Sequence, residues 1–198
     1  TLIPRPDTEI LAGYAVDFLR TRAKEGTDDL WIADIGTGTG AIALSVLHHT
    51  EGTRADAVDI SSAAAEVARE NAATLGLSER VAVFVGDLTV PLAGRSYDMI
   101  LSNPPYIPTA DIAKLMPEVR SYEPHRALDG GTDGLDLYRR LMADAPAMLK
   151  DGGAIAVEVG IHEAAAVAAL ALAHPCIVRT EILKDLGGIE RVVVGYTE

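Results

Sequence analysis

Apolar runs of strand length alternate with helix-length segments along almost the whole of this 198-residue sequence. Short apolar runs without polar alternation are typical of strands buried on both faces, and such strands belong to parallel sheets covered by helices. The strand-length runs are residues 30–35, 55–60, 81–85, 97–102, 154–159, 177–183 and 191–196. The helical segments are residues 8–23, 40–49, 61–75, 135–150 and 162–173, with Gly152-Gly153 between the fourth helix and the next strand.

The last two strand-length runs have no helix between them, and the segment that joins them contains Gly187-Gly188. Strands joined by a short turn pair as an antiparallel hairpin, whereas parallel neighbours need a longer crossover. The sequence therefore predicts an α/β fold, a doubly wound and mostly parallel sheet of about seven strands with an antiparallel last strand. We expect one domain over residues 1–198, because this length suits a single hydrophobic core.

The composition limits the partners that we expect. A formal net charge of −12 disfavours a bare polynucleotide, because proteins that grip phosphates depend on basic surfaces. No apolar stretch reaches the roughly 18 residues of a membrane span, so we expect no membrane partner and a cytoplasmic location. The single cysteine, Cys176, excludes an internal disulfide, and its apolar neighbours predict that it packs in the core. The five histidines have no partners at metal-ligand spacing, so we expect no metal.

A glycine-rich turn, Asp34-Ile35-Gly36-Thr37-Gly38-Thr39-Gly40, follows the first predicted strand and opens a helix. Glycines at such a turn let the backbone bend tightly and approach a ligand closely. Gly36, Gly38 and Ala41 also satisfy the dinucleotide pattern, so this motif alone leaves a nicotinamide-dependent oxidoreductase open.

Two acidic residues follow the next two predicted strands. Asp59 lies about 20 residues beyond the glycines, where a carboxylate can accept hydrogen bonds from the ribose diol of a nucleoside cofactor. Asp87 follows the third strand, where an adenine amino group could donate to it. A lone acid at such a place is as often a helix cap or a solvated strand end, but two beside a glycine turn favour a cofactor site.

The fourth predicted strand ends in Ser102-Asn103-Pro104-Pro105-Tyr106, a sequence for which a dehydrogenase has no use. The prolines donate no hydrogen bond and hold the backbone extended, so their carbonyl groups project as fixed acceptors. The Asn103 side-chain oxygen and a proline carbonyl together suit the two N–H bonds of an –NH2 group. Tyr106 offers a ring on which a planar amide or base can stack. The motif therefore predicts a site for a planar nitrogen acceptor.

Over essentially its whole length, the chain resembles the catalytic domain of the release-factor glutamine methyltransferases, the HemK/PrmC family. The resemblance rests on Ile3-Pro4-Arg5-Pro6-Asp7-Thr8-Glu9, Asp34–Gly40, Asn103–Tyr106, Glu123-Pro124, Ala127-Leu128, Gly134-Leu135 and Gly188-Ile189-Glu190-Arg191. The Asn-Pro-Pro-Tyr motif is shared with adenine-N6 and guanine-N2 nucleic-acid methyltransferases, whereas the opening motif is much narrower and lies over the active site in this family.

The resemblance implies the Rossmann-like fold of class I methyltransferases, with S-adenosylmethionine as cofactor and S-adenosylhomocysteine as product. It implies that the cofactor is bound by Gly36, Thr37, Gly38, Thr39, Gly40, Asp59, Asp87, Leu88 and Asn103, with Asp87 and Leu88 near the adenine. It implies that Asn103, Pro104, Pro105 and Tyr106 seat the substrate glutamine, that Asn103, Pro104 and Tyr106 are catalytic, and that Arg5 is a candidate substrate contact. The roles of Glu9, Glu123 and Arg126 stay open.

The implied reaction is methylation of the side-chain nitrogen of the glutamine in the Gly-Gly-Gln loop of peptide-chain release factors. We expect release factors as partners and no direct binding of nucleic acid. The nearest alternative is a nucleic-acid amino-group methyltransferase acting on adenine N6 or guanine N2, and a non-catalytic nucleoside-binding module is another. Members of the family usually carry a small helical domain ahead of this one, and the chain starts at Thr1 without an initiator methionine, so we expect a fragment.

Overall fold

The computed structural model describes residues 8–116 and 127–198. In these residues a seven-stranded sheet has the order β3-β2-β1-β4-β5-β7-β6. The strands are β1 (Trp31–Ile35), β2 (Arg54–Asp59), β3 (Val81–Val85), β4 (Tyr97–Ser102), β5 (Leu149–Glu158), β6 (Arg179–Lys184) and β7 (Glu190–Tyr196). The helices are α1 (Thr8–Lys24), α2 (Ala41–His49), α3 (Ser62–Thr74), α4 (Thr109–Ile112), α6 (Asp136–Asp144) and α7 (Ala164–Leu172), with short 3-10 turns at Val90–Leu92 and Ala145–Met148.

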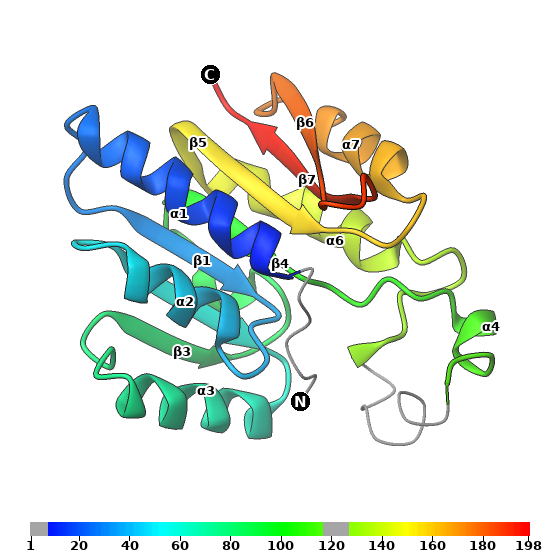
Figure 1. Cartoon of the computed structure of the whole chain (residues 1–198), viewed down its shortest axis with the longest axis horizontal. Coiled ribbons are helices and arrows are strands. Elements are labelled where there is room, and N and C mark those ends of the chain that lie inside the picture. The colour runs from blue at the N-terminus through cyan, green and yellow to red at the C-terminus, as the bar shows by residue number, and fades with distance from the viewer. Residues whose placement is uncertain (1–7, 117–126) are drawn as a thin grey trace.

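The sheet is parallel from β3 through β5, and β7 runs antiparallel to both of its neighbours, β5 and β6. This arrangement confirms the predicted fold class and the predicted hairpin at the end of the chain. Parallel pairing brings the carboxyl ends of β1, β2, β4 and β5 to one edge of the sheet (Figure 1). The residues that end these strands are Ile35, Asp59, Ser102 and Glu158.

Helices cover both faces of the sheet, so nearly all side chains of the central strands β1, β2 and β4 are buried. Side chains of α1 and α2 pack with Met99 and Leu101 of β4 on one face. Side chains of α6 and α7 pack with the intervening Ile100 on the other face. All six residues of β4 are buried, so alternate side chains along one strand supply both cores.

Three local predictions were wrong or need adjustment. The helix predicted to reach residue 150 ends at Asp144, because Pro146 has no N–H to continue the helical ladder. Gly152-Gly153 lies inside β5 rather than before it, where Gly152 adopts a positive φ of 66° beside a register shift against β4. Cys176 is exposed and not part of the core; its neighbour Ile177 is the side chain that is buried.

The two-sided core predicts a strong contrast between two leucine truncations. Leu101→Ala removes a side chain that is 0% exposed, and we expect a loss of about 2–5 kcal/mol of unfolding free energy from lost burial and the cavity left behind. Leu172→Ala, on the outer surface of α7 with 49% exposure, should cost about 1 kcal/mol or less. Urea denaturation measures both, and equal losses would contradict this description of the core.

Candidate active site

A buried acid, Asp34, holds the glycine turn that follows β1 through hydrogen bonds. Asp34 Oδ2 accepts hydrogen bonds from the Thr37 hydroxyl at 2.6 Å and from the Ala43 N–H at 3.1 Å. Burial raises the pKa of Asp34 to about 6; the two hydrogen bonds oppose this rise and the nearby charge of Asp59 adds to it. The other oxygen, Oδ1, is buried without a hydrogen-bond partner among the described residues. Asp34 therefore holds the turn and keeps one acceptor unused.

Backbone conformation, not packing, requires glycine at positions 36 and 38. Their φ angles are +76° and +58°, a region that side chains rarely adopt, and a Cβ added to either would meet no atom within 4 Å. The turn thus presents bare backbone next to open space, the arrangement that lets a ligand approach closely.

Asp59, at the end of β2, lies directly against this turn. Its Oδ2 accepts from the Gly38 N–H and its Oδ1 accepts from the Ser61 N–H, both at 2.8 Å. Each carboxylate oxygen has a second lone pair, so Asp59 retains capacity to accept from a ligand hydroxyl. The turn is tied to the rest of the sheet edge as well, since the Asn71 side chain donates to the Thr39 carbonyl at 2.9 Å.

Asp87 and Leu88 follow β3 on the same side of the sheet. The Asp87 carboxylate accepts a 2.6 Å hydrogen bond from Arg140 on α6, and both side chains are about half exposed, at 46% and 52%. Leu88 has a positive φ of 48° and packs against the core beneath α6 and α7. The contact of Arg140 with Asp87 could not be predicted from the sequence, because no local pattern links two residues that lie so far apart in the chain.

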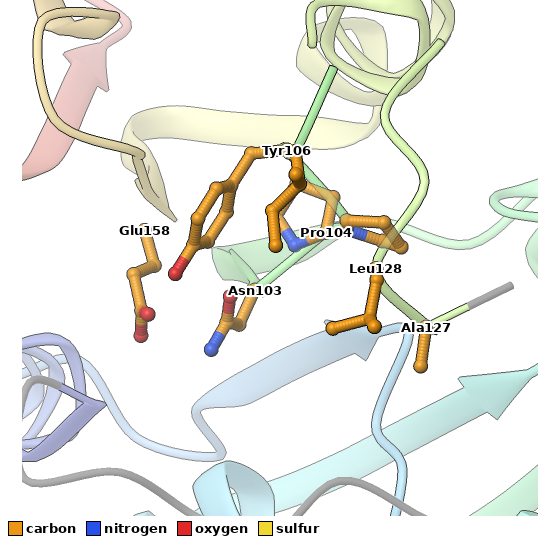
Figure 2. A pocket seen from close by; sticks show the side chains of 8 residues that line it. Asn103, Pro104, Tyr106, Ala127, Leu128 and Glu158 are labelled. Atoms are coloured by element: carbon orange, nitrogen blue, oxygen red, sulfur yellow. The ribbon is translucent and has the colours of Figure 1, made fainter. Parts of the chain in front are cut away.

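The Asn-Pro-Pro-Tyr segment forms the wall of a pocket at the end of β4 (Figure 2). The lining residues are Asn103, Pro104, Pro105, Tyr106, Ile107, Ala127, Leu128 and Glu158. Figure 2 shows the Tyr106 ring standing beside Asn103, with its hydroxyl directed toward Glu158. The structure therefore brings together the four motif residues that the sequence singled out.

Three glycines make room for Tyr106. A Cβ added at Gly130 would lie 2.8 Å from Tyr106 Cα, one at Gly134 would lie 2.5 Å from its carbonyl oxygen, and one at Gly160 would lie 2.9 Å from its ring. Such distances are too short for real contacts, so any larger residue at these positions would displace the tyrosine. Backbone from the loop after α4 and from the end of β5 thus fixes the ring.

Two polar side chains stand behind Asn103: Thr8, which the sequence placed in the opening motif without a role of its own, and Glu158, which the sequence did not single out. The Asn103 amide nitrogen donates to the Thr8 hydroxyl oxygen at 3.3 Å, and Thr8 donates to Glu158 Oε2 at 2.8 Å. Glu158 is 3% exposed, and its backbone carbonyl accepts from the Tyr138 hydroxyl at 2.7 Å. An acid at the end of a strand was a detectable signal, but its apolar neighbours gave no reason to separate it from the core.

The remaining candidates from the sequence have different outcomes. Arg5, Glu123 and Arg126 lie outside the described residues. Glu9 is exposed in the first turn of α1. Within the described residues, no helix is long and apolar enough to cross a membrane, and no group of three or more His, Cys, Asp or Glu side chains could hold a metal ion.

Comparison with known proteins identifies the family. Residues 17–118 match the family model described as the methyltransferase small domain. The release factor glutamine methyltransferase of Gloeobacter violaceus is 46% identical over 98% of this chain and 66% of its own length, and that of Moorella thermoacetica is 45% identical over 98% and 67%. The chain belongs to the release factor glutamine methyltransferase family. It spans about two thirds of the length of these relatives.

Solved structures agree with this family and fold. A release-factor-specific protein-(glutamine-N5) methyltransferase from Alicyclobacillus acidocaldarius superposes with a TM-score of 0.60 at 31% identity, covering 99% of this chain and 94% of its own. The human Mettl16 catalytic domain gives a TM-score of 0.73 at 16% identity over 98% of this chain and 71% of its own, a likeness of fold alone. Membership of the glutamine methyltransferase family confirms the resemblance seen in the sequence. It also excludes the oxidoreductase alternative that the glycine turn had left open.

One acid beside the pocket predicts a pH-dependent stability in this family member. Partial burial raises the pKa of Glu163 to about 7 from 4.5, although the Gly160 N–H, which donates to Glu163 Oε2 at 3.1 Å, opposes the rise; the charge of Asp133 adds to it. The protonated form is favoured in the folded state. The stability that this group contributes is therefore complete below about pH 4.5 and is lost as the pH rises through about 7.

We expect the melting temperature of the wild type to fall more between about pH 5 and about pH 8 than that of Glu163→Gln, which cannot ionise. Thermal unfolding of both proteins in matched buffers measures the difference. Parallel pH profiles would show that Glu163 does not titrate in this range.

Proposed function

We propose that this chain transfers a methyl group from S-adenosylmethionine to the side-chain amide nitrogen, N5, of the glutamine in the Gly-Gly-Gln motif of peptide-chain release factors. The observation that carries the proposal is the position of the Asn103–Tyr106 pocket, on the same sheet edge as the glycine turn and beside it through the β1–β4 pairing. The names of the relatives, which match nearly all of this chain, support the substrate.

The residues at the sheet edge fit the proposed cofactor. Gly36 and Gly38 leave space for a close approach, Asp59 can accept from a ribose hydroxyl, and Asp34 Oδ1 is a buried acceptor beneath the turn. Thr37, Thr39 and Gly40 complete the turn, and Asp87 with Leu88 would hold the adenine. When bound, S-adenosylmethionine supplies a methyl group activated by a positively charged sulfur, and it leaves as S-adenosylhomocysteine.

The chain's own residues would act by orientation. An amide nitrogen is a weak nucleophile because its lone pair is delocalised into the carbonyl group. Asn103 Oδ1 and the Pro104 carbonyl oxygen would accept hydrogen bonds from its two N–H groups, and Tyr106 would stack on the amide plane. These contacts would hold the nitrogen in line for transfer. Acceptors placed for a nitrogen that loses its planarity favour the transition state over the ground state. Among the described residues that line the pocket there is no His, Lys or Cys, so we expect no such side chain to act as general base. The acceptor nitrogen gains the methyl group and then loses one proton to solvent.

The direct test is methyl transfer from labelled S-adenosylmethionine to purified, unmodified release factor, with tRNA, rRNA and DNA in parallel. We expect label on the Gly-Gly-Gln glutamine and none on a release factor in which that glutamine is alanine. The chain itself contains no glutamine, so self-labelling cannot mimic the result. Label on nucleic acid alone would instead support an adenine N6 or guanine N2 methyltransferase, which the net charge of −12 disfavours.

Asn103→Ala should abolish turnover, because it removes one of the two acceptors that orient the nitrogen. Cofactor affinity should stay within a few-fold, since the glycine turn and Asp59 are untouched. Single-turnover kinetics and calorimetric titration of S-adenosylhomocysteine separate the two effects. A variant with a near-normal rate would exclude this role for Asn103.

Asp59→Ala should have the opposite effect, a weaker cofactor affinity with a nearly unchanged rate at saturating cofactor. It removes a carboxylate bonded to Gly38 and proposed to accept from the ribose, and we expect cofactor affinity to fall about tenfold or more. At saturating cofactor the rate should recover to within a few-fold of the wild type. Unchanged affinity in the calorimeter would show that Asp59 only supports the turn.

A further inference from the structure

Three polar side chains from distant parts of the chain, two buried and one half-buried, meet at the back of the nitrogen pocket. Thr8 begins α1, Asn103 follows β4 and Glu158 ends β5. Asn103 Nδ2 lies 3.3 Å from Thr8 Oγ1, and Thr8 Oγ1 lies 2.8 Å from Glu158 Oε2. Thr8 is 9% exposed and Glu158 is 3% exposed, so water competes little for these bonds.

The chemistry of these groups permits one direction of hydrogen bonding. A carboxylate can only accept hydrogen bonds, so the single hydroxyl proton of Thr8 must be donated to Glu158. The Thr8 oxygen can then only accept from Asn103, which requires the amide nitrogen of Asn103 to face it. A flipped amide would set two oxygen lone pairs against each other and leave a buried acceptor unsatisfied.

The amide oxygen is consequently directed to the other side. In Figure 2 the Asn103 nitrogen points away from Tyr106, and the oxygen lies on the side of the Tyr106 ring. An asparagine at the surface would exchange between these two orientations, because the ends of its amide group have nearly the same shape. Here the acceptor that faces the pocket is fixed before any substrate arrives.

We propose that Thr8 and Glu158 are positioning residues that fix the Asn103 amide with its oxygen toward the acceptor nitrogen. This inference rests on the proposed function for the identity of the acceptor. Its consequence is a choice between the two ends of a substrate amide. The –NH2 end can donate to Asn103 Oδ1 and to the Pro104 carbonyl, whereas the carbonyl end, or a glutamate carboxylate, would meet two acceptors.

Two substitutions at position 8 distinguish the contribution of the hydroxyl group to the rate from that of the rest of the side chain. Thr8→Val has nearly the same shape without the hydroxyl, and Thr8→Ser keeps the hydroxyl with less bulk. We expect kcat toward release factor to fall about tenfold or more in Thr8→Val and to stay within about threefold of wild type in Thr8→Ser. Cofactor affinity should change less than about twofold in both, because neither touches the glycine turn.

Thr50→Val is the matched control. Thr50 is also buried, at 6% exposure, and its hydroxyl donates to the Val46 carbonyl at the end of α2, away from the pocket. This variant loses a buried hydroxyl without touching Asn103, so its kcat should equal that of the wild type. If Thr8→Val keeps the wild-type kcat, or if Thr8→Ser is as impaired as Thr8→Val, the proposal is wrong.

A spectroscopic test needs no substrate. The chain contains two asparagines, Asn71 and Asn103, and no glutamine, so its side-chain amide NMR spectrum holds two –NH2 signal pairs. Asn103→Asp assigns them by removing one pair. In Thr8→Val we expect the Asn103 pair to shift and its protons to exchange faster with solvent, while Thr8→Ser keeps both properties.

The Asn71 pair, which donates to the Thr39 carbonyl, should not move and serves as the internal reference. An Asn103 pair that is unaffected in Thr8→Val would overturn the positioning role, even for an enzyme that methylates release factor. If the wild type methylates no release factor, the proposed function fails, and the NMR comparison still decides whether Thr8 holds the Asn103 amide.

Discussion

The reversal of strand order between the parallel strands β1 and β4 is the constraint on which the site depends. From β1 the chain crosses by α2 to β2, and from β4 it crosses by α6 to β5 on the opposite side and over the opposite face. The loops that leave β1 and β4 therefore diverge at the carboxyl edge of two hydrogen-bonded strands. One loop is the glycine turn and the other is the Asn-Pro-Pro-Tyr segment. Their separation is set by the strand pairing, not by the loops themselves.

Three carboxylates, of which Asp34 and Glu158 are buried, hold these loops in shape. Asp34 fastens the glycine turn through Thr37 and Ala43, and Asp59 bonds the same turn from β2. Glu158 anchors the Thr8 hydroxyl behind Asn103. A buried carboxylate is costly unless its hydrogen bonds are made, so Asp34 and Glu158 fix the donors around them. The same cost appears in the raised pKa of Asp34. These hydrogen bonds fix the loops at the place where the proposed function requires a weak nucleophile to be oriented.

Much of the fold could be predicted because the inner strands, such as β1 and β4, are buried on both faces and leave mostly apolar runs in the sequence. The positions of Asp59 and Asn103 also followed, since parallel strands carry their final residues to one edge. The helix before β5 was predicted too long because its apolar pattern continues past Pro146 into the strand. The Cys176 prediction failed because a short apolar run does not show which of its members faces inward.

The support around the site could not be predicted, because it depends on pairs that are far apart in the chain. Thr8 and Glu158 are separated by 150 positions, and Asp87 and Arg140 by 53. The contact of Glu163 with the glycines behind Tyr106 depends on backbone packing that no local pattern records. Arg5 and Glu123 lie outside the described residues, and their roles stay predictions.

In the proposed function, Asn103 and Pro104 hold the acceptor nitrogen through hydrogen bonds from its two N–H groups. A crystal structure of this chain with S-adenosylhomocysteine and a Gly-Gly-Gln peptide tests it most directly. We expect the glutamine amide nitrogen about 3 Å from both Asn103 Oδ1 and the Pro104 carbonyl oxygen, and directed at the cofactor sulfur. A glutamine bound with its amide oxygen toward Asn103, or seated outside this pocket, would contradict it.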